Sequence, residues 1–240
     1  MNDKVFILVF MTYVSLVASN LAPFITKCKW DDTKCLKESS QKALPFFAEG
    51  IPELKVPRHD PMYIKLVDAS TSNLKLIVTD IEVTGLKNCQ AKKIVRNIED
   101  SLLTVKFVCA VDFKGKYDMK GKLILFPIEG NGQLTAKVPK IVINADIYYE
   151  NKVHKDGNNY WHVKSWKHNF ELKAESDVKF ENLFPGNELL RNTTNELIAT
   201  HGNDVIIEIG PKIVHALIEL VVDGLKGFFL EVPTKDLVLE

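Results

Sequence analysis

The sequence predicts an α+β fold in which a highly curved antiparallel β-sheet wraps a long C-terminal helix, with a short helix near the N-terminus. Hydrophobic residues alternate with a period of two from about residue 63 to residue 183, and then recur at helical spacing over about forty residues. A helix of that length spans about 60 Å, and the sequence has no second helix of comparable length to cover its apolar stripe. The inner face of the sheet is the only apolar surface large enough, so we expect the sheet to curl around the helix and to enclose an elongated interior.

The composition narrows the classes of partner. The chain has 240 residues, of which 46% are hydrophobic, and this is enough to bury a large core. Lys and Arg number 31 and Asp and Glu also number 31, without a basic stripe or a polybasic run. A phosphate backbone or an anionic membrane surface would need such a cluster of positive charge, so we expect neither nucleic acid nor stable membrane insertion.

The first nineteen residues are typical of a secretory signal peptide. Lys4 provides a positive flank, Val5 to Val17 form an apolar run, and the small residues Ala18 and Ser19 follow. A run of about thirteen residues is shorter than the roughly twenty that a membrane-spanning helix needs. We therefore predict cleavage near Ser19 and a soluble, extracellular mature protein.

Secretion makes the four cysteines candidates for disulfide bonds. Cys28 and Cys35 lie seven residues apart just before the first predicted helix, and we predict that they are bridged. Closing so small a loop stabilises the fold by about 2.5 kcal/mol in the chain-entropy model. Cys89 and Cys109 come close to facing each other if residues 97–101 turn between two strands. A second bridge and two separate buried thiols both stay open, and no spacing resembles a zinc or CxxC redox site.

The N-terminal helical segment is expected to run to about Gly50. Asp31, Asp32 and Thr33 offer capping oxygens at its start, and Gly50 ends it. Pro45 lies inside this segment and is expected to kink or split it. An extended, proline-containing stretch follows to about Met62.

The strands follow from alternation of apolar residues. Leu74, Leu76 and Val78 alternate, after which the phase slips and Ile81 continues it, which is typical of a β-bulge that bends a sheet. Further strands are expected at residues 103–113, 123–128, 141–149 and 160–174. Short turns join the strands, and one of these turns is expected at residues 155–159.

The C-terminal helical pattern begins at Asn187 and forms one very long helix or two helices end to end. Gly202 and the Gly210–Pro211 pair mark the expected bends. Asn192 begins a glycosylation sequon in the first turns of this helix, and the sequence leaves its occupancy open.

Several segments resemble the juvenile hormone-binding and takeout family of insects. The most specific is Phe180-Glu-Asn-Leu-Phe-Pro-Gly-Asn-Glu-Leu-Leu, because Leu-Phe-x-Gly-Asn-x-x-Leu at the start of a long C-terminal helix is characteristic of the takeout branch. The Cys28–Cys35 spacing also fits, and the similarity extends from about residue 28 to residue 239. The other matching segments are residues 50–62, 83–88, 115–128 and 130–132.

The resemblance implies a single lipid-carrier domain over residues 20–240, of the lipid-binding half-barrel type also seen in bactericidal/permeability-increasing proteins. Members carry juvenile hormone, other terpenoids, fatty acyl or quinone-like lipids in a long internal cavity, with roles that include hormone transport, chemosensory delivery and circadian or feeding control.

Two features depart from the family pattern. Cys89 and Cys109 are not where the hormone carriers place their second bridge, which favours the takeout branch. Many members also have a tryptophan where this chain has Asn203-Asp204-Val205.

A carrier needs an apolar lining and one or two polar groups that fix the head of the ligand. Tyr148 and Tyr149 are the candidate anchors, because a phenol joins an apolar body to a hydrogen-bonding tip. Strand alternation points Tyr149 inward, whereas the resemblance to hormone carriers, which have a tyrosine-rich segment here, favours Tyr148 equally.

Trp161 and Trp166 are expected to be structural. Plain core packing is the alternative role for each of the expected lining residues, which are Phe107, Val111, Leu125, Ile143, Ile147, Ile213, Leu217 and Phe228.

Enzyme signatures are missing from the sequence: it contains no GxSxG elbow, HExxH motif or P-loop. We therefore expect no catalytic residue, no metal site and no cofactor. The function expected is that of a monomeric, secreted carrier that binds a small elongated hydrophobic ligand in an internal tunnel. The alternatives are an extracellular interaction module of the same fold with a filled cavity, and a secreted lipid-ester hydrolase.

Overall fold

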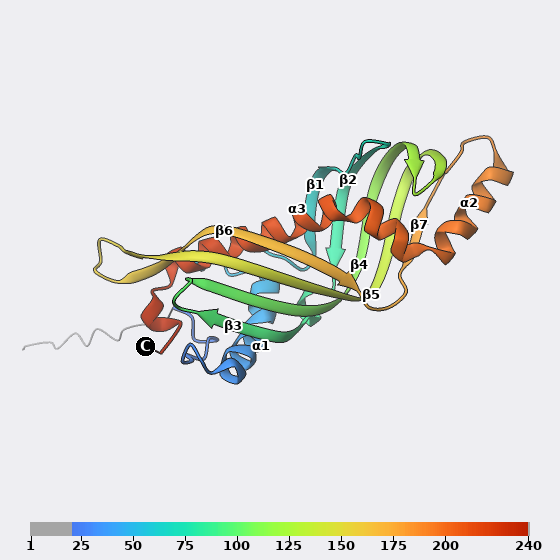
Figure 1. Ribbon diagram of the computed structural model, residues 1–240. Coiled ribbons are helices and arrows are strands. Elements are labelled where there is room, and N and C mark those ends of the chain that lie inside the picture. Colours follow the sequence, from blue (N-terminus) through green and yellow to red (C-terminus); the bar gives the residue numbers. More distant parts are fainter. Residues whose placement is uncertain (1–20, 240) are drawn as a thin grey trace, which may run out of the picture.

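The computed structural model describes residues 21–239, and the predicted signal peptide, residues 1–19, lies outside the described residues. Helices and strands follow the predicted order (Figure 1). The helices are α1 (Thr33–Glu49), α2 (Glu188–Thr200) and α3 (Gly202–Glu231), with three short 3-10 helices, η1 (Pro52–Leu54), η2 (Leu86–Asn88) and η3 (Thr234–Asp236). The strands are β1 (Met62–Asp68), β2 (Leu74–Thr84), β3 (Gln90–Asn97), β4 (Leu102–Leu123), β5 (Phe126–Val153), β6 (Asn159–Leu172) and β7 (Asp177–Phe180).

All seven strands form one antiparallel sheet with the order β1-β2-β4-β5-β6, while β3 pairs with β4 and β7 pairs with β5. Strands β4 and β5 have 22 and 28 residues, and each pairs with different neighbours along its two halves. Residues 112–121 of β4 pair with β2 and residues 102–108 pair with β3. The register shifts between Cys109 and Val111, close to where β4 changes neighbour, and again between Thr79 and Glu82, where the sequence predicted a bulge. Such irregularities bend a sheet, and the predicted curved antiparallel sheet is confirmed.

The C-terminal helical region is two helices end to end. The break lies at His201, and α3 then continues without interruption through Gly210 and Pro211, so only the first of the two expected bends separates helices. Gly202 is required at the break, because a Cβ atom there would collide with the carbonyl oxygen of Ser176. Figure 1 shows α3 running along most of the molecule, with α2 at one end and the C-terminus near the other. Among residues 21–239, no helix has the length and apolar character needed to cross a bilayer.

Helix α1 packs on β3 and is fixed to it by one side chain. The amide of Gln41 donates to the carbonyl of Cys89 (3.1 Å) and accepts from the backbone N–H of Ala91 (2.8 Å). Asp32 caps the start of the helix by accepting from the N–H of Cys35 (2.9 Å), and Pro45 lies within the helix without splitting it.

Both cysteine pairs are bridged. The predicted Cys28–Cys35 disulfide is present, with a Cα–Cα distance of 5.7 Å. The question that the sequence left open for Cys89 and Cys109 is answered by a second disulfide, with a Cα–Cα distance of 4.3 Å. This second bridge joins the residue just before β3 to the middle of β4, next to the register shift.

The sheet and α3 enclose two different interiors. One is a dense core, here called the packed half, formed by β1, β2, β7, the hairpin end of β4 and β5, α2 and the first half of α3. Its fully buried side chains include Leu76, Val78, Met119 and Leu183. The other, here called the hollow half, lies between α1, β3, β6, the remaining parts of β4 and β5 and the second half of α3.

Candidate ligand-binding cavity

The hollow half contains a cavity of about 370 Å³, within the range typical of small-molecule sites. Its wall is almost entirely aliphatic and aromatic, and no acidic residue and no lysine contributes to it. A second depression, on the outer surface near Glu49 and Asp223, is larger but is lined by charged residues and open to solvent. The apolar cavity of the hollow half is the less open of the two and is therefore the better site for a hydrophobic molecule.

The sheet provides one wall of the cavity through alternate residues of its two longest strands. Every second residue of β4 from Leu103 to Val111 lies on it, and so does every second residue of β5 from Ile141 to Ile147. This is the period-two pattern that predicted the strands, since successive side chains of a strand point to opposite faces.

Helix α1 provides the opposite wall, and much of the free space comes from the small side chains on it. Ser39, Ser40, Ala43 and Ala48 all face the cavity. Together with Ala145 of β5, they leave volume that larger residues would fill. The second half of α3 completes the enclosure, chiefly with Leu217, Ile218, Val221, Val222, Leu225, Phe228 and Phe229.

Six of the predicted lining residues lie on the cavity wall: Phe107, Val111, Ile143, Ile147, Leu217 and Phe228. Ile213 does not, because it is one helical position away from the wall residue Val214 and packs in the dense core of the packed half. The prediction for Leu125 was wrong. The apolar run from Leu123 to Ile128 is not one strand but the end of β4, a turn formed by Ile124 and Leu125, and the start of β5, and Leu125 is 80% exposed in this turn.

Neither candidate tyrosine lies on the wall. Tyr149 points inward as predicted and is 3% exposed, but its hydroxyl accepts a hydrogen bond from Nε of Arg96 (3.1 Å) instead of facing the cavity. Tyr148 points to the outer face, where Nζ of Lys167 lies 5.7 Å from its ring centroid. Tyr149 thus orients the side chain of Arg96, and Arg96 lies on the cavity wall.

The polar end of the cavity is formed by Arg96 and Trp161, which the sequence-based selection of site residues missed. Arg96 is 9% exposed, and its Cζ lies 4.8 Å from the ring centroid of Trp161. Trp161 is 5% exposed and packs against Tyr149 and Phe229, with centroid distances of 4.9 and 5.1 Å. The signal for Arg96 was its position two residues after Ile94, because this spacing places a charged side chain on the inner face of a strand.

Most other buried polar groups near the cavity are already satisfied by backbone. Oγ of Ser39 donates to the carbonyl of Thr26 and accepts from its N–H, both at 2.9 Å. The two ring nitrogens of His59 lie 3.1 Å and 3.2 Å from the carbonyl oxygens of Phe47 and Leu220. By contrast, Nε1 of Trp161 is buried with no hydrogen-bond partner among the described residues.

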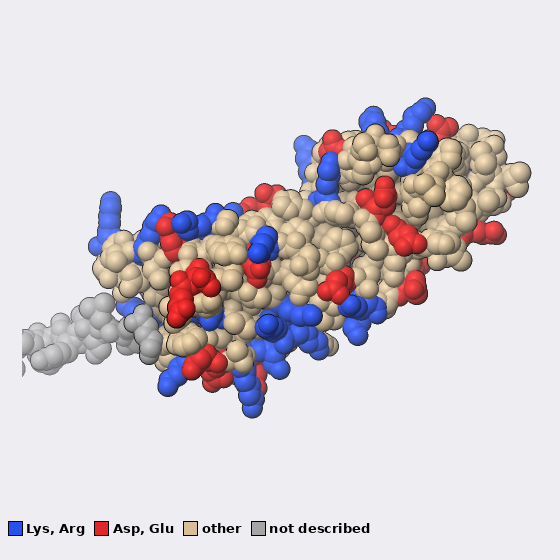
Figure 2. Space-filling view, viewed as in Figure 1, with Lys and Arg blue, Asp and Glu red and all other residues tan. Residues whose placement is uncertain are grey.

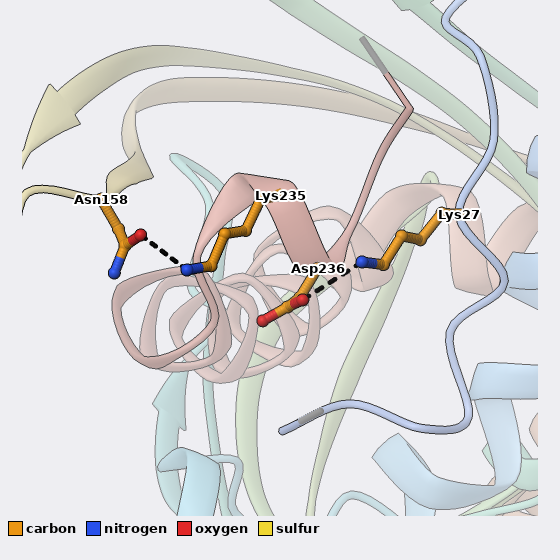
Figure 3. Close-up of polar contacts among 4 residues, drawn as sticks. All are labelled: Lys27, Asn158, Lys235 and Asp236. Carbon is orange, nitrogen blue, oxygen red and sulfur yellow. Dashed lines mark hydrogen bonds and ion pairs between the residues drawn. The ribbon is translucent and has the colours of Figure 1, made fainter. Parts of the chain in front are cut away.

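The end of the cavity next to Trp161 is covered by residues 232–239, here called the closing segment. Its Leu237 and Val238 lie on the cavity wall, and Val238 pairs with Cys28 as a parallel β-bridge. Two polar contacts attach the η3 turn of this segment (Figure 3). Nζ of Lys27 lies 3.2 Å from Oδ1 of Asp236, and Nζ of Lys235 donates to Oδ1 of Asn158 at 2.8 Å. The closing segment thus covers this end of the cavity. It is held in place by its backbone pairing, by a few apolar side chains and by contacts at the surface.

The outer surface carries mixed charge. Figure 2 shows Lys and Arg interspersed with Asp and Glu on the face viewed, without a field of one sign. Every ion pair between described residues uses a lysine, and none involves Arg96. The sequon residue Asn192 lies exposed on α2.

Comparison with known proteins agrees with this arrangement. The family model described as haemolymph juvenile hormone binding protein matches residues 5–239. Two relatives, each described as circadian clock-controlled protein daywake, come from Drosophila yakuba (25% identical) and Drosophila melanogaster (27% identical), and each match covers 79% of this chain and 77% of the relative. The crystal structure of Epiphyas postvittana Takeout 1 superposes with a TM-score of 0.86 at 24% identity, covering 90% of this chain and 100% of that chain.

Proposed function

The chain belongs to the haemolymph juvenile hormone binding protein family, and from this premise we propose that it is an extracellular carrier of a small, elongated hydrophobic molecule. The observation that carries the proposal is the apolar cavity of the hollow half. Apolar surface moved from water into such a cavity gains about 25 cal/mol per Å². Part of this gain is lost to ordering the ligand, and we expect an affinity of micromolar or tighter.

The division of the interior supports a carrier over an interaction module with a filled cavity. The packed half is lined by large side chains that are almost fully buried, whereas the small residues of α1 leave free volume in the hollow half. A protein that used only its outer surface would gain stability from larger residues at these positions, because filling a void restores packing contacts.

The proposal is tested by expressing the full chain, including residues 1–19, in insect cells and purifying the protein from the medium. Native mass spectrometry should reveal one bound apolar molecule per chain, and organic extraction should release it. The purified protein should also bind a neutral fluorescent probe such as N-phenyl-1-naphthylamine, and long-chain lipids should displace the probe. Retention of the protein inside the cells would contradict secretion, and a protein that binds neither probe nor lipid would contradict the carrier function.

A further inference from the structure

We infer that the ligand is an amphiphile with a carboxylate head group, which the guanidinium of Arg96 and the indole N–H of Trp161 bind at the covered end of the cavity. This inference rests on the proposed carrier function and narrows it from hydrophobic molecules in general to anionic ones. The apolar tail would then lie along the wall formed by β4, β5 and α3.

The first step is the burial of an unpaired cation. Arg96 is 9% exposed and lies on the wall of an apolar cavity, yet among the described residues no carboxylate is within ion-pair distance of it. Burying a charge without a partner of opposite charge is costly, so buried charges are normally paired. An anionic ligand would supply the missing partner.

The second step is the way the guanidinium is held. Its Nε donates to the hydroxyl of Tyr149 at 3.1 Å, and its Cζ lies 4.8 Å from the ring centroid of Trp161. Both partners are neutral, and they fix the orientation of the side chain without neutralising it. A guanidinium has five N–H donors, and the bond to Tyr149 uses one of them. The donors of the two terminal nitrogens remain for an acceptor that the described part of the chain does not provide.

The third step is a second donor without an acceptor at the same place. Nε1 of Trp161 is buried and unpartnered, and it belongs to a side chain on the cavity wall. His168 Nδ1 and Ser176 Oγ are also buried without partners among the described residues, but neither residue lies on this wall. An indole nitrogen can only donate. The cavity therefore presents donors at one end, and the matching ligand brings acceptor oxygens there.

A carboxylate fits this pair of side chains better than a neutral acceptor does. An ester, ketone or epoxide oxygen could accept the hydrogen bonds, but it would leave the positive charge of Arg96 without a counterion. A carboxylate has two acceptor oxygens and a negative charge, and hydrogen bonds between guanidinium and carboxylate are among the strongest in proteins. Its second oxygen is available to the indole N–H.

The test compares ligands that differ only in the head group. Displacement of N-phenyl-1-naphthylamine is measured for palmitic acid and its methyl ester, and for farnesoic acid and its methyl ester, so that straight and branched tails are distinguished. In the wild-type protein, at a pH where the acids are ionised, at least one acid should bind at least about tenfold more tightly than its ester. Equal affinities within both pairs would overturn the inference and leave the carrier function intact. Failure of all four compounds and of the probe would instead overturn the carrier function.

Variants then assign the preference to the two side chains. Arg96→Met retains an unbranched apolar stem and should bring the ratio of acid to ester affinity close to one, because it removes the positive charge that only the acid can pair with. Arg96→Lys keeps the charge but loses the planar fork, and should give an intermediate ratio. Trp161→Phe keeps an aromatic ring and removes the N–H, and should lower the ratio by about two- to fivefold. Arg58→Met is the matched control, because the side chain of Arg58 lies outside the cavity with its Nε bonded to the carbonyl of Asp60 (3.0 Å).

The outcomes of the variant series are decisive in both directions. A ratio that Arg96→Met leaves at the wild-type value would overturn the inference, and so would an equal fall in Arg58→Met. If Arg96→Met does not fold, the wild-type ratio and the Arg96→Lys variant still decide the matter, since neither depends on removing the charge.

Discussion

The packed and hollow halves of this protein are built on the same two strands but have different interiors. In the packed half, inward residues of β2 and β4 such as Leu76 (0% exposed) meet Val205 and Ile209 of α3 and Leu183 of the loop after β7. In the hollow half, the inward residues of the same β4 meet α1, whose facing residues are largely Ser and Ala. The strands therefore set where an interior exists, and the element on the opposite side decides whether it is filled.

The largest expected difference between the halves is in the cost of deleting a large side chain. Leu76→Ala in the packed half should lower the free energy of unfolding by about 3 kcal/mol, because it opens a void in a close-packed core. Ile143→Ala on the cavity wall should cost only about 1 kcal/mol, because its side chain already borders free space and has fewer neighbours to lose. Urea unfolding of both variants measures the two costs, and equal losses would show that the halves are packed alike.

The next largest effect is expected on ligand binding when the hollow half is made to resemble the packed half. Ala145→Phe places a large ring in the cavity from the sheet wall and should weaken binding of a neutral fluorescent probe by at least about tenfold. The melting temperature should hold or rise, because added apolar contacts replace empty volume.

The control for this substitution is Ala199→Phe, at an exposed position of α2 far from the cavity wall. It should leave probe affinity unchanged. Unaltered affinity in Ala145→Phe would place the probe outside the cavity and would contradict the proposed binding site.

The sequence predicted which side chains line the interior, but not whether that interior is filled or hollow. Alternation predicted the wall residues Phe107, Val111, Ile143 and Ile147, because strand geometry alone fixes which side chains share a face. Their position beside free volume could not be predicted, because it depends on how far α1 lies from the sheet. The same pattern of apolar residues describes a filled core and a lined cavity equally well.

The errors also have physical reasons. Leu125 lies in a turn whose other residue, Ile124, has a φ of 59°, and a β-branched residue in that region gives no turn signal in a sequence. Tyr149 was chosen for its own chemistry, but its hydroxyl is used by Arg96, which is distant in sequence and paired with it only through the fold. The sequence contained the clue to Arg96 in its inward register, although a single charge in a short strand is easily assigned to the surface.

A smaller effect on folding stability is expected when the pH is lowered, and it comes from the contact between β6 and α3 in the hollow half. Nε2 of His168 lies 3.1 Å from Nδ1 of His215, and Trp166 stacks on His215 at 4.9 Å. Burial lowers the pKa of His168, and the neighbouring His215 lowers it further. The folded state therefore binds a proton less readily than the unfolded chain, whose His pKa is about 6.5. Stability from this group is complete above that value and is lost as the pH falls through the folded pKa.

Urea midpoints measured between pH 7.5 and pH 5 test this expectation. His168→Gln should reduce the loss of stability on acidification, because the neutral amide does not titrate. His201→Gln, at an exposed position after α2, is the control and should leave the wild-type slope unchanged. A slope that His168→Gln does not alter would assign the acid sensitivity to other groups.

The smallest effect on stability, but a specific one on ligand release, is expected at the closing segment. The Lys27–Asp236 and Lys235–Asn158 contacts attach η3 over the end of the hollow half that contains Arg96 and Trp161. Pairs at the surface contribute less than about 1 kcal/mol each, so Asp236→Asn combined with Lys235→Ala should barely change the unfolding midpoint. The same loss of attachment should open the segment more often and speed release of the probe by about two- to fivefold in stopped-flow displacement.

Lys120→Ala removes a comparable surface pair with Glu129 on the β4–β5 hairpin of the packed half and should leave the release rate unchanged. If the closing-segment variant releases the probe at the wild-type rate, the ligand leaves by another route, and the wall formed by α1 becomes the element to loosen next.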